Sequence, residues 1–524
     1  MESRSILTAT AGVILGMGLT AVTAETLRFG ASADIYGFDP HGVTSSYDNI
    51  FVHNIYEPLV RYSPQLEIEP ALATHWEIIE PTRIRYFLRE GVTFHGGETF
   101  DAEDVAMSLM RAVHPNSPLR GNLPGLVDVE IVDDLTVDLI MAGPSPLLNN
   151  FLTNIFIMDA GWMRENNAVE PINANQGEEG YTTSNANGTG PFMVESRRPD
   201  SQTVLVNNAD WWDEPQHNLT RIEHRPISSA ATRVAALLSG EIDLIQPAPL
   251  QDAARIEAAP GVRMLENPGL RTIMMGFNLT DTLNDGNVEG NPLQDIRVRR
   301  AIKHAIDMDL IHERIMRGKS RNTAALIAPE VPGFAPELNE RLPHDPDRSR
   351  ELLAEAGFPD GFTFNMNCTN DNYVNDEGIC QAMAAMLARV GLEPRLVAEP
   401  RQIHFERAQT GQTDMFMMGW ATLPMLDGFS VLSAMLHSPD GSYGTWNPGQ
   451  YHNERVDELT QAAAVELDQD ARIAMMVEAF SIAKDEMAWL PLHQQPLAWA
   501  ARDEVDVFQS ADDLVRLWHV RIDR

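Results

Sequence analysis

The sequence has only two cysteines in 524 residues, Cys368 and Cys380. Two thiols without nearby histidines fall short of the four ligands of a structural zinc site, so the pair predicts no metal. In a secreted chain, an even and closely spaced pair indicates one disulfide, which here would close a small loop around residues 372–375. Two free, buried thiols are the alternative.

Positive charge is also scarce, since 39 Lys and Arg residues stand against 75 Asp and Glu residues, for a net charge of -36. Such a surface repels nucleic acid and anionic lipid headgroups, and we therefore expect neither as a partner. The excess of acid favours solubility. A field that steers cationic ligands toward the protein is the alternative explanation.

Long apolar runs are absent outside the N-terminus. The run from Ile6 to Leu19 follows Arg4, contains Gly and Thr, and is shorter than the roughly 20 residues that span a bilayer. It leads to small residues at 22–24, which predicts a cleaved secretory signal over residues 1–24. No cysteine follows that could be acylated, so we expect a periplasmic protein that is not a lipoprotein.

Common catalytic motifs are missing as well. The sequence has no H-E-x-x-H, no G-x-S-x-G, no phosphate-binding G-x-x-x-x-G-K-[ST] and no G-x-G-x-x-G between a strand and a helix. The 15 histidines are dispersed. We therefore predict no catalytic residues, no metal and no cofactor. Because a catalytic triad can be scattered in sequence, a secreted hydrolase remains the alternative from another class.

The chain is longer than the roughly 250–300 residues at which a single core stops growing, which predicts two large lobes. Helices followed by Gly240 or Gly391 and then by a strand predict α/β lobes with mixed sheets. We expect strands at 26–30, 83–88, 93–95, 192–196, 203–206, 242–245, 392–397 and 413–418. We expect helices at 50–60, after Asp101, and at 230–239, 297–306, 381–390 and 453–485.

The most distinctive candidate for ligand binding is Trp420, which follows a predicted strand. Gly419 would let another backbone segment approach closely, and the indole ring can form the apolar wall of a pocket. Asp427 could anchor a ligand ammonium through a charge-assisted hydrogen bond. A helix cap before residues 429–432 is the alternative role for Asp427.

Five blocks, in order, resemble the family 5 extracellular solute-binding proteins, which include the dipeptide, oligopeptide and nickel receptors of bacterial ABC importers. The similarity extends over nearly the whole mature chain. The blocks are residues 54–60, residues 88–97 with 100–105, residues 188–192 with 207–212, residues 239–243, and residues 277–278 with 295–301.

The resemblance implies a type II periplasmic-binding-protein fold of the α/β class, with two lobes joined by a hinge and an inserted subdomain. The first lobe would comprise residues 25–50, 189–272 and 493–524, with residues 51–188 as the inserted subdomain. The second lobe would comprise residues 273–492. The hinge would lie near residues 271–277 and 490–495. The implied protein is a monomer that delivers a small solute to the permease and ATPase subunits of an importer.

One position departs from the pattern of the peptide receptors. In those receptors an acidic residue three positions after the Gly-Trp tryptophan holds the peptide's amino group, whereas this chain has Leu423 there. The basic residue that some receptors carry just before Gly-Trp is replaced by methionine.

We predict a peptide or peptide-like solute. Nickel or a metal chelate, an opine and an oligosaccharide remain open, as does a chaperone or signalling role on the same fold. The residues expected to line the cleft are Tyr36, Phe38 and Tyr47 from one lobe and Trp420, Thr422 and Asp427 from the other.

Overall fold

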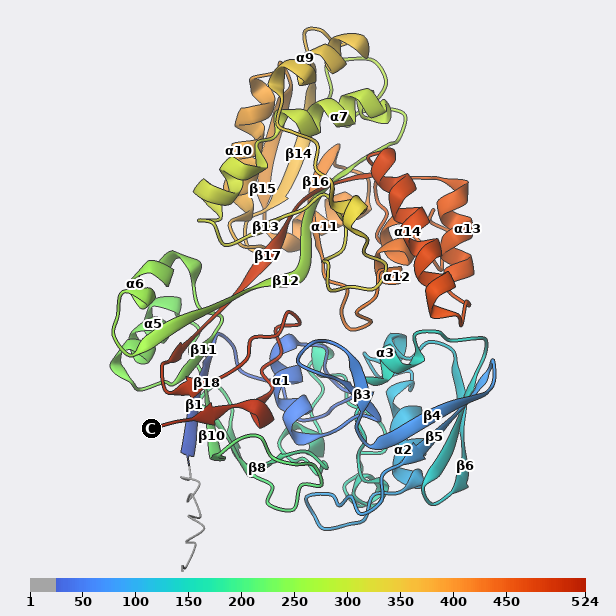
Figure 1. The fold of residues 1–524 in the computed structure, drawn as a ribbon, viewed down its shortest axis with the longest axis vertical. Helices are drawn as coiled ribbons and strands as arrows, with labels where there is room; N and C mark the ends of the chain where they lie inside the picture. The colour runs from blue at the N-terminus through green and yellow to red at the C-terminus, as the bar shows by residue number, and fades with distance from the viewer. Residues whose placement is uncertain (1–24) are drawn as a thin grey trace, which may run out of the picture.

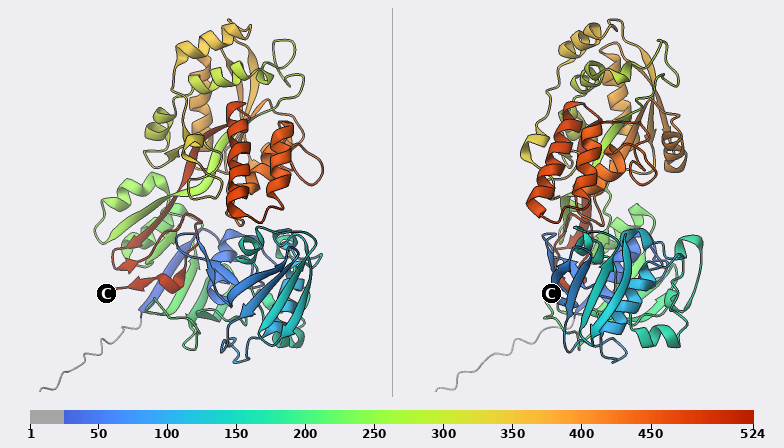
Figure 2. Two further views of the ribbon diagram at one scale, coloured as in Figure 1. Left: turned by 45° about the vertical axis from the view of Figure 1, so that its right-hand side comes forward. Right: turned by 90° about the vertical axis from the view of Figure 1, so that its right-hand side faces the viewer.

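The computed structural model describes residues 25–524, so the predicted signal at 1–24 lies outside the described residues. Two α/β lobes lie one above the other, and two long strands run between them (Figure 1). The same separation is visible from the two other directions in Figure 2. One eleven-stranded sheet extends through both lobes in the order β15-β14-β16-β12-β17-β11-β1-β10-β9-β8, with β13 paired to β17.

The two connecting strands are β12 (Val262–Phe277) and β17 (Trp489–Arg502). They pair antiparallel from Val262 opposite Arg502 to Gly276 opposite Trp489. The register shifts between Pro268 and Thr272, where the ladder passes from one lobe to the other. Such an interruption bends a pair of strands locally. The two strands therefore continue from one lobe into the other, but the sheet bends between the lobes.

The lower lobe in Figure 1 is built on β1, which pairs in parallel with both β10 and β11. Its helices are α1 (Ser46–Ile55), α5 (Ala230–Ser239) and α6 (Ala253–Glu257). Its remaining strands are β1 (Glu25–Ala31), β8 (Phe192–Arg198), β9 (Gln202–Asn207), β10 (Leu219–Pro226), β11 (Leu244–Gln246), β18 (Val505–Asp506) and β19 (Arg521–Ile522).

Beside this sheet lies a smaller unit with its own four-stranded sheet, in the order β4-β5-β7-β6. Its helix α2 (Ala102–Ala112) begins directly after Asp101, as the sequence predicted, with a capping box between Asp101 and Asp104. The other elements are β2 (Val60–Tyr62), β3 (Ile68–Pro70), β4 (Ala73–Glu80), β5 (Arg83–Leu88), β6 (Leu126–Asp133), β7 (Thr136–Met141), α3 (Leu148–Leu152) and α4 (Ala160–Glu165).

The upper lobe buries both faces of its part of the sheet. In β16 (Met415–Trp420), Met415 and Met417 enter one hydrophobic cluster while Phe416 and Met418 enter another. Side chains alternate between the two faces of a strand, so covering both faces requires the continuous apolar run that the sequence shows here.

The other elements of the upper lobe are arranged around β16. They are α7 (Ile296–Ala305), α8 (Met308–Leu310), β13 (Arg321–Asn322), α9 (Pro346–Glu355), β14 (Thr363–Thr369), α10 (Asp376–Ala388), β15 (Glu393–Glu399), α11 (Arg401–Gln409), α12 (Phe429–Val431), α13 (Glu454–Ala463) and α14 (Gln469–Asp485). A disulfide joins Cys368 on β14 to Cys380 on α10.

Three local predictions were wrong. The helix expected at 50–60 begins earlier and ends at Ile55, because Pro58 disfavours helical backbone at the residue before it. The strand expected at 93–95 is reduced to one bridge between Thr93 and Thr99. The helix expected at 453–485 is two helices, because Asp468 caps the second one by accepting a hydrogen bond from the amide of Ala471.

Buried Asp243 connects both ends of the described chain. Its carboxylate accepts hydrogen bonds from Arg28 on β1 (2.6 and 2.9 Å) and from Arg524, the last residue (2.8 Å). Since Asp243 is fully buried, its charge depends on these partners.

We predict that Asp243→Asn lowers the free energy of unfolding by about 1–2 kcal/mol, because Arg28 loses its charge-assisted hydrogen bonds, whereas Arg524 still contacts Glu25 and Glu504. Urea unfolding monitored by circular dichroism measures the change. Asp506→Asn is the matched control, because Asp506 is an exposed aspartate on neighbouring β18. Equal stability of the two variants would contradict this role.

Candidate ligand-binding cleft

A cavity of about 990 Å³ lies between the two lobes. Its walls come from α1, β2 and the C-terminal segment on one side, and from α11, the end of β16 and the loop after it on the other. The lining residues are Thr44, Asn49, Ile50, His53, Arg61, Tyr62, Leu119, Asn122, Thr153, Asn154, Gln246, Pro247, Arg271, Asn372, Tyr373, Arg401, Phe405, Met418, Gly419, Trp420, Ala421, Leu423, Pro424, Trp446, Asp512, Asp513, Leu514, Arg516 and Trp518.

Aromatic rings form the apolar wall in the upper lobe. Trp446 contacts Trp420 with ring centroids 6.4 Å apart, and it packs edge-on against Phe405 at 5.8 Å. The indole Nε1 of Trp420 donates to Ser430 Oγ (3.3 Å), which fixes the ring. A wall of this kind can pack against an apolar part of a solute.

Gly419 makes room for the ring of Tyr373. A Cβ at position 419 would lie 2.6 Å from Tyr373 Cε1 and 2.7 Å from Ile273 Cδ1, which is too close for any side chain. The amide of Gly419 donates to Tyr373 Oη (2.7 Å). The sequence predicted that another backbone approaches Gly419, but the groups that approach it are the side chains of Tyr373 and Ile273.

Two arginines in the cleft form no ion pair with a carboxylate among residues 25–524. Arg271, on β12, donates from Nη1 to the carbonyl of Gly419 (3.1 Å) and lies 5.9 Å from the centroid of the Tyr373 ring. Arg401 begins α11, and its side chain is exposed at the cleft. Guanidinium groups bind carboxylates in a bidentate fashion, so both are suited to an anionic solute group.

The arginines on the opposite wall are paired. Arg61 contacts Glu69 and Asp213 at 2.7 Å each, and Arg516 contacts Asp512 at 2.7 Å. Burial opposes ionisation of Asp512, but Arg516 holds the pKa of that carboxyl below its usual value. This wall therefore contributes little free positive charge.

Asp513 is the cleft carboxylate that has no basic ion-pair partner within the described chain. Its Oδ1 accepts a hydrogen bond from Trp499 Nε1 (2.7 Å). Burial raises the pKa of Asp513 to about 6, and neighbouring Asp512 acts in the same direction. A solute ammonium group would compensate this charge.

The two lobes touch at one edge of the cleft. Tyr62 Oη donates to the carbonyl of Met425 (3.0 Å), and Asn150 Nδ2 donates to the same oxygen (2.7 Å). The loop at 421–428, which follows Trp420, is thus in contact with the opposite lobe.

The sequence-predicted residues are only partly brought together. Trp420 lines the cleft, and Tyr36 is 58% exposed but does not line it. Thr422 is buried, and its Oγ1 has no hydrogen-bond partner in the part of the chain that is described. The side chain of Tyr47 lies outside the described residues.

Two of the expected ligand contacts need correction. Phe38 is fully buried in the core of the lower lobe, because it packs among apolar side chains of β1 and α1. Asp427 is 2% exposed and forms two hydrogen bonds of 2.9 Å with Arg472 of its own lobe. It also accepts a hydrogen bond from the amide of Phe429 (2.8 Å), just before α12, although the N-cap residue of that helix is Gly428.

Five residues of the cleft were not predicted from the sequence: Arg271, Arg401, Asp513, Tyr373 and Trp446. Arg271 lies within the stretch that the resemblance assigned to the hinge. A single cation in that stretch could have indicated that it faces the cleft. The others come from separate loops and helices, and no spacing in the sequence links them.

We predict that Asp427→Asn lowers the free energy of unfolding by about 3 kcal/mol, because buried Arg472 loses its counterion. Affinity for a peptide solute should stay within about twofold. Urea unfolding and calorimetric titration separate the two effects, with exposed Asp360→Asn as the control. A tenfold loss of affinity at unchanged stability would restore Asp427 as a ligand anchor.

The amino-acid sequence is similar to those of known binding proteins along nearly its whole length. The chain is 25% identical, over 92% of its length and 91% of the relative's, to a glutathione-binding protein of Salmonella paratyphi A. It is 26% identical, over 94% of both chains, to the dipeptide-binding protein of Escherichia coli.

Among solved structures, a periplasmic binding protein of Helicobacter pylori, associated with an ABC transporter and bound to a peptide, superposes with a TM-score of 0.71. It is 24% identical, and the match covers 96% of this chain and 98% of that one. This likeness shows the type II periplasmic-binding-protein fold. Within residues 25–524, no helix has the length and apolar character needed to span a bilayer.

Residues 67–443 match the family described as bacterial extracellular solute-binding proteins, family 5. That match covers most of the chain and includes the loop after Trp420. The protein therefore belongs to the family 5 extracellular solute-binding proteins of bacteria, and its function is solute binding.

Proposed function

We propose that this protein is the receptor of an ABC importer and captures a short anionic peptide between its lobes. The observation that carries the proposal is the pair of guanidinium groups, Arg271 and Arg401, that line the cleft without carboxylate partners in the described chain. In a protein with a net charge of -36, unpaired cations at one cavity favour an anionic solute over a neutral one.

A zwitterionic backbone fits the distribution of charge across the cleft. Asp513 lies on the lower wall, and the two arginines lie on the hinge strand and the upper wall. An ammonium group would bind Asp513, a carboxylate would bind Arg271 and Arg401, and the apolar part would pack on Trp420 and Trp446.

Glutathione is the first solute to test. It carries two carboxylates and one ammonium, which corresponds to the two unpaired arginines and to Asp513. One relative is named a glutathione-binding protein and another a dipeptide-binding protein, so peptides are the chemical class that these names support.

Capture would require the lobes to close. We propose the division into lobes that the family resemblance implies. The lower lobe comprises residues 25–50, 189–272 and 493–524 with the unit at 51–188 attached to it, and the upper lobe comprises residues 273–492. Closure would bend β12 and β17 near their register shift, since hinge motions concentrate at a few residues. The permease would then recognise the closed form.

The remaining parts of the proposal follow from this role. The segment 1–24 would direct secretion and be cleaved, and the mature protein would act as a monomeric periplasmic receptor without a lipid anchor. It would bind its solute without converting it, so the solute should be recovered unchanged after binding.

We predict that Arg401→Gln and Arg271→Gln each weaken glutathione binding by about 1.5–3 kcal/mol, because each removes a charged hydrogen-bond donor. Isothermal titration calorimetry measures the change. Arg407→Gln is the control, since Arg407 lies on the same helix and pairs with Glu399 outside the cleft. Unchanged affinity in both cleft variants would refute the anionic-solute proposal.

We also predict that affinity for glutathione falls as the pH is lowered through about 6. The pKa of Asp513 in the free protein is raised to about 6 by burial, so acidification neutralises the proposed ammonium partner. Asp513→Asn should bind more weakly at pH 7.5 and should lose this part of the pH dependence. A variant with the pH profile of the wild type would exclude Asp513 from the site.

A further inference from the structure

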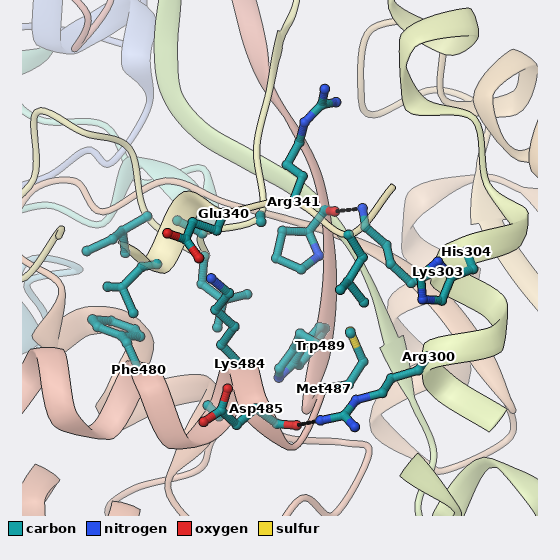
Figure 3. A pocket seen from close by; sticks show the side chains of 18 of the residues that line it. Arg300, Lys303, His304, Glu340, Arg341, Phe480, Lys484, Asp485, Met487 and Trp489 are labelled. Carbon is teal, nitrogen blue, oxygen red and sulfur yellow. Dashed lines mark hydrogen bonds between the residues drawn. The ribbon is translucent and has the colours of Figure 1, made fainter. Parts of the chain in front are cut away.

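A second cavity, of about 500 Å³, lies inside the upper lobe and shares no residue with the cleft. Figure 3 shows it between α7, α14, the strand β17 and the loop that carries Glu340 and Arg341. Its apolar walls come from both hydrophobic clusters of the lobe, with Leu352 and Met487 adjoining one and Phe480 and Trp489 belonging to the other.

The cavity concentrates a residue type that this chain hardly uses. The sequence has three lysines, Lys303, Lys319 and Lys484, and two of them line this cavity. Arg300, His304, Arg341 and Arg348 line it as well, against the two acids Glu340 and Asp485. The chain as a whole has 75 acidic and 39 basic residues, whereas basic residues outnumber acidic ones around this cavity.

Within the described part of the chain, three of these cationic side chains donate hydrogen bonds only to backbone carbonyls. Lys303 Nζ donates to the carbonyl of Pro491 (3.3 Å), Arg300 to that of Asp485 (3.0 Å) and Lys484 to that of Glu337 (2.5 Å). In contrast, Arg341 pairs with Asp309 and Arg348 with Glu351 and Glu355. Figure 3 shows the Arg341 guanidinium directed away from the cavity.

Lys303 is the most informative of the three. It is 5% exposed, and within residues 25–524 it forms no ion pair. Burial lowers the pKa of Lys303 to about 8, and the nearby charge of Arg341 adds to this effect. A buried ammonium with one long hydrogen bond retains donors for a further acceptor.

We propose that this cavity is a second binding site, for a small amphiphile with one carboxylate and an apolar body. The carboxylate would bind Lys303, while Arg300 and Lys484 add positive charge at other places on the cavity wall. The apolar body would contact Trp489, Met487 and Phe480. The site is independent of the peptide cleft, so either proposal can fail without the other.

Isothermal titration calorimetry with octanoate tests the site, with octan-1-ol as the neutral analogue of the same length. We expect octanoate to bind with one site per chain, and octan-1-ol to bind at least tenfold more weakly. Lys303→Met and Lys484→Met should each weaken octanoate binding at least tenfold. Lys319→Met, which changes the one lysine outside the cavity, should leave it unchanged.

A cleft variant distinguishes the two sites, because Arg401 could also attract a carboxylate. Arg401→Gln should leave octanoate binding intact. If Arg401→Gln abolishes binding while Lys303→Met retains it, octanoate occupies the peptide cleft and the second site is refuted. Equal affinity for octanoate and octan-1-ol, or no octanoate binding to the wild type, would also refute it. Since Lys484 is only partly buried, its variant provides a test that does not depend on a core substitution.

Discussion

The antiparallel pairing of β12 with β17 is the constraint on which the other features depend. These two strands carry the sheet from one lobe to the other, and the longest interruption of their ladder lies between Pro268 and Thr272. Arg271 lies in that interruption, and its guanidinium reaches the carbonyl of Gly419 at the end of β16. One pair of strands therefore connects the two lobes and contributes Arg271 to the cleft between them.

Charge is distributed unevenly over the two walls of the cleft. On the lower wall each arginine forms an ion pair with a carboxylate, as Arg516 does with Asp512. On the upper wall, Arg401 has no carboxylate partner in the described chain. An unpaired charge stays costly in a cavity that closes away from water, unless the solute brings its counterion. In this account the solute supplies the missing carboxylate, and closing the lobes then removes both charges from water as a pair.

Much of the fold could be predicted from the sequence, because local signals are strong where they occur. One helix begins after Asp101 and another ends at left-handed Gly240, as the sequence predicted. The apolar run in β16 was predicted as a strand, but that it is covered on both faces depends on packing with distant helices. Pro58 was an available stop signal that the helical spacing at 50–60 obscured.

The site was less predictable, because its chemistry depends on pairing between residues far apart in the chain. Asp427 was a reasonable anchor by its distance from Trp420, but Arg472, 45 residues later, neutralises it. Arg401 and Asp513 are separated by more than one hundred residues, and neither lies in a recognisable motif. Which charges are free and which are paired can be determined only from the folded structure.

The most direct test of the account is small-angle X-ray scattering during titration with glutathione. Closure of two lobes around a solute predicts that the radius of gyration decreases and reaches its limit at one solute per chain. Because Arg271→Gln binds more weakly, it should reach the same decrease only at a correspondingly higher glutathione concentration. Calorimetric saturation of the wild type with an unchanged radius of gyration would contradict capture between closing lobes.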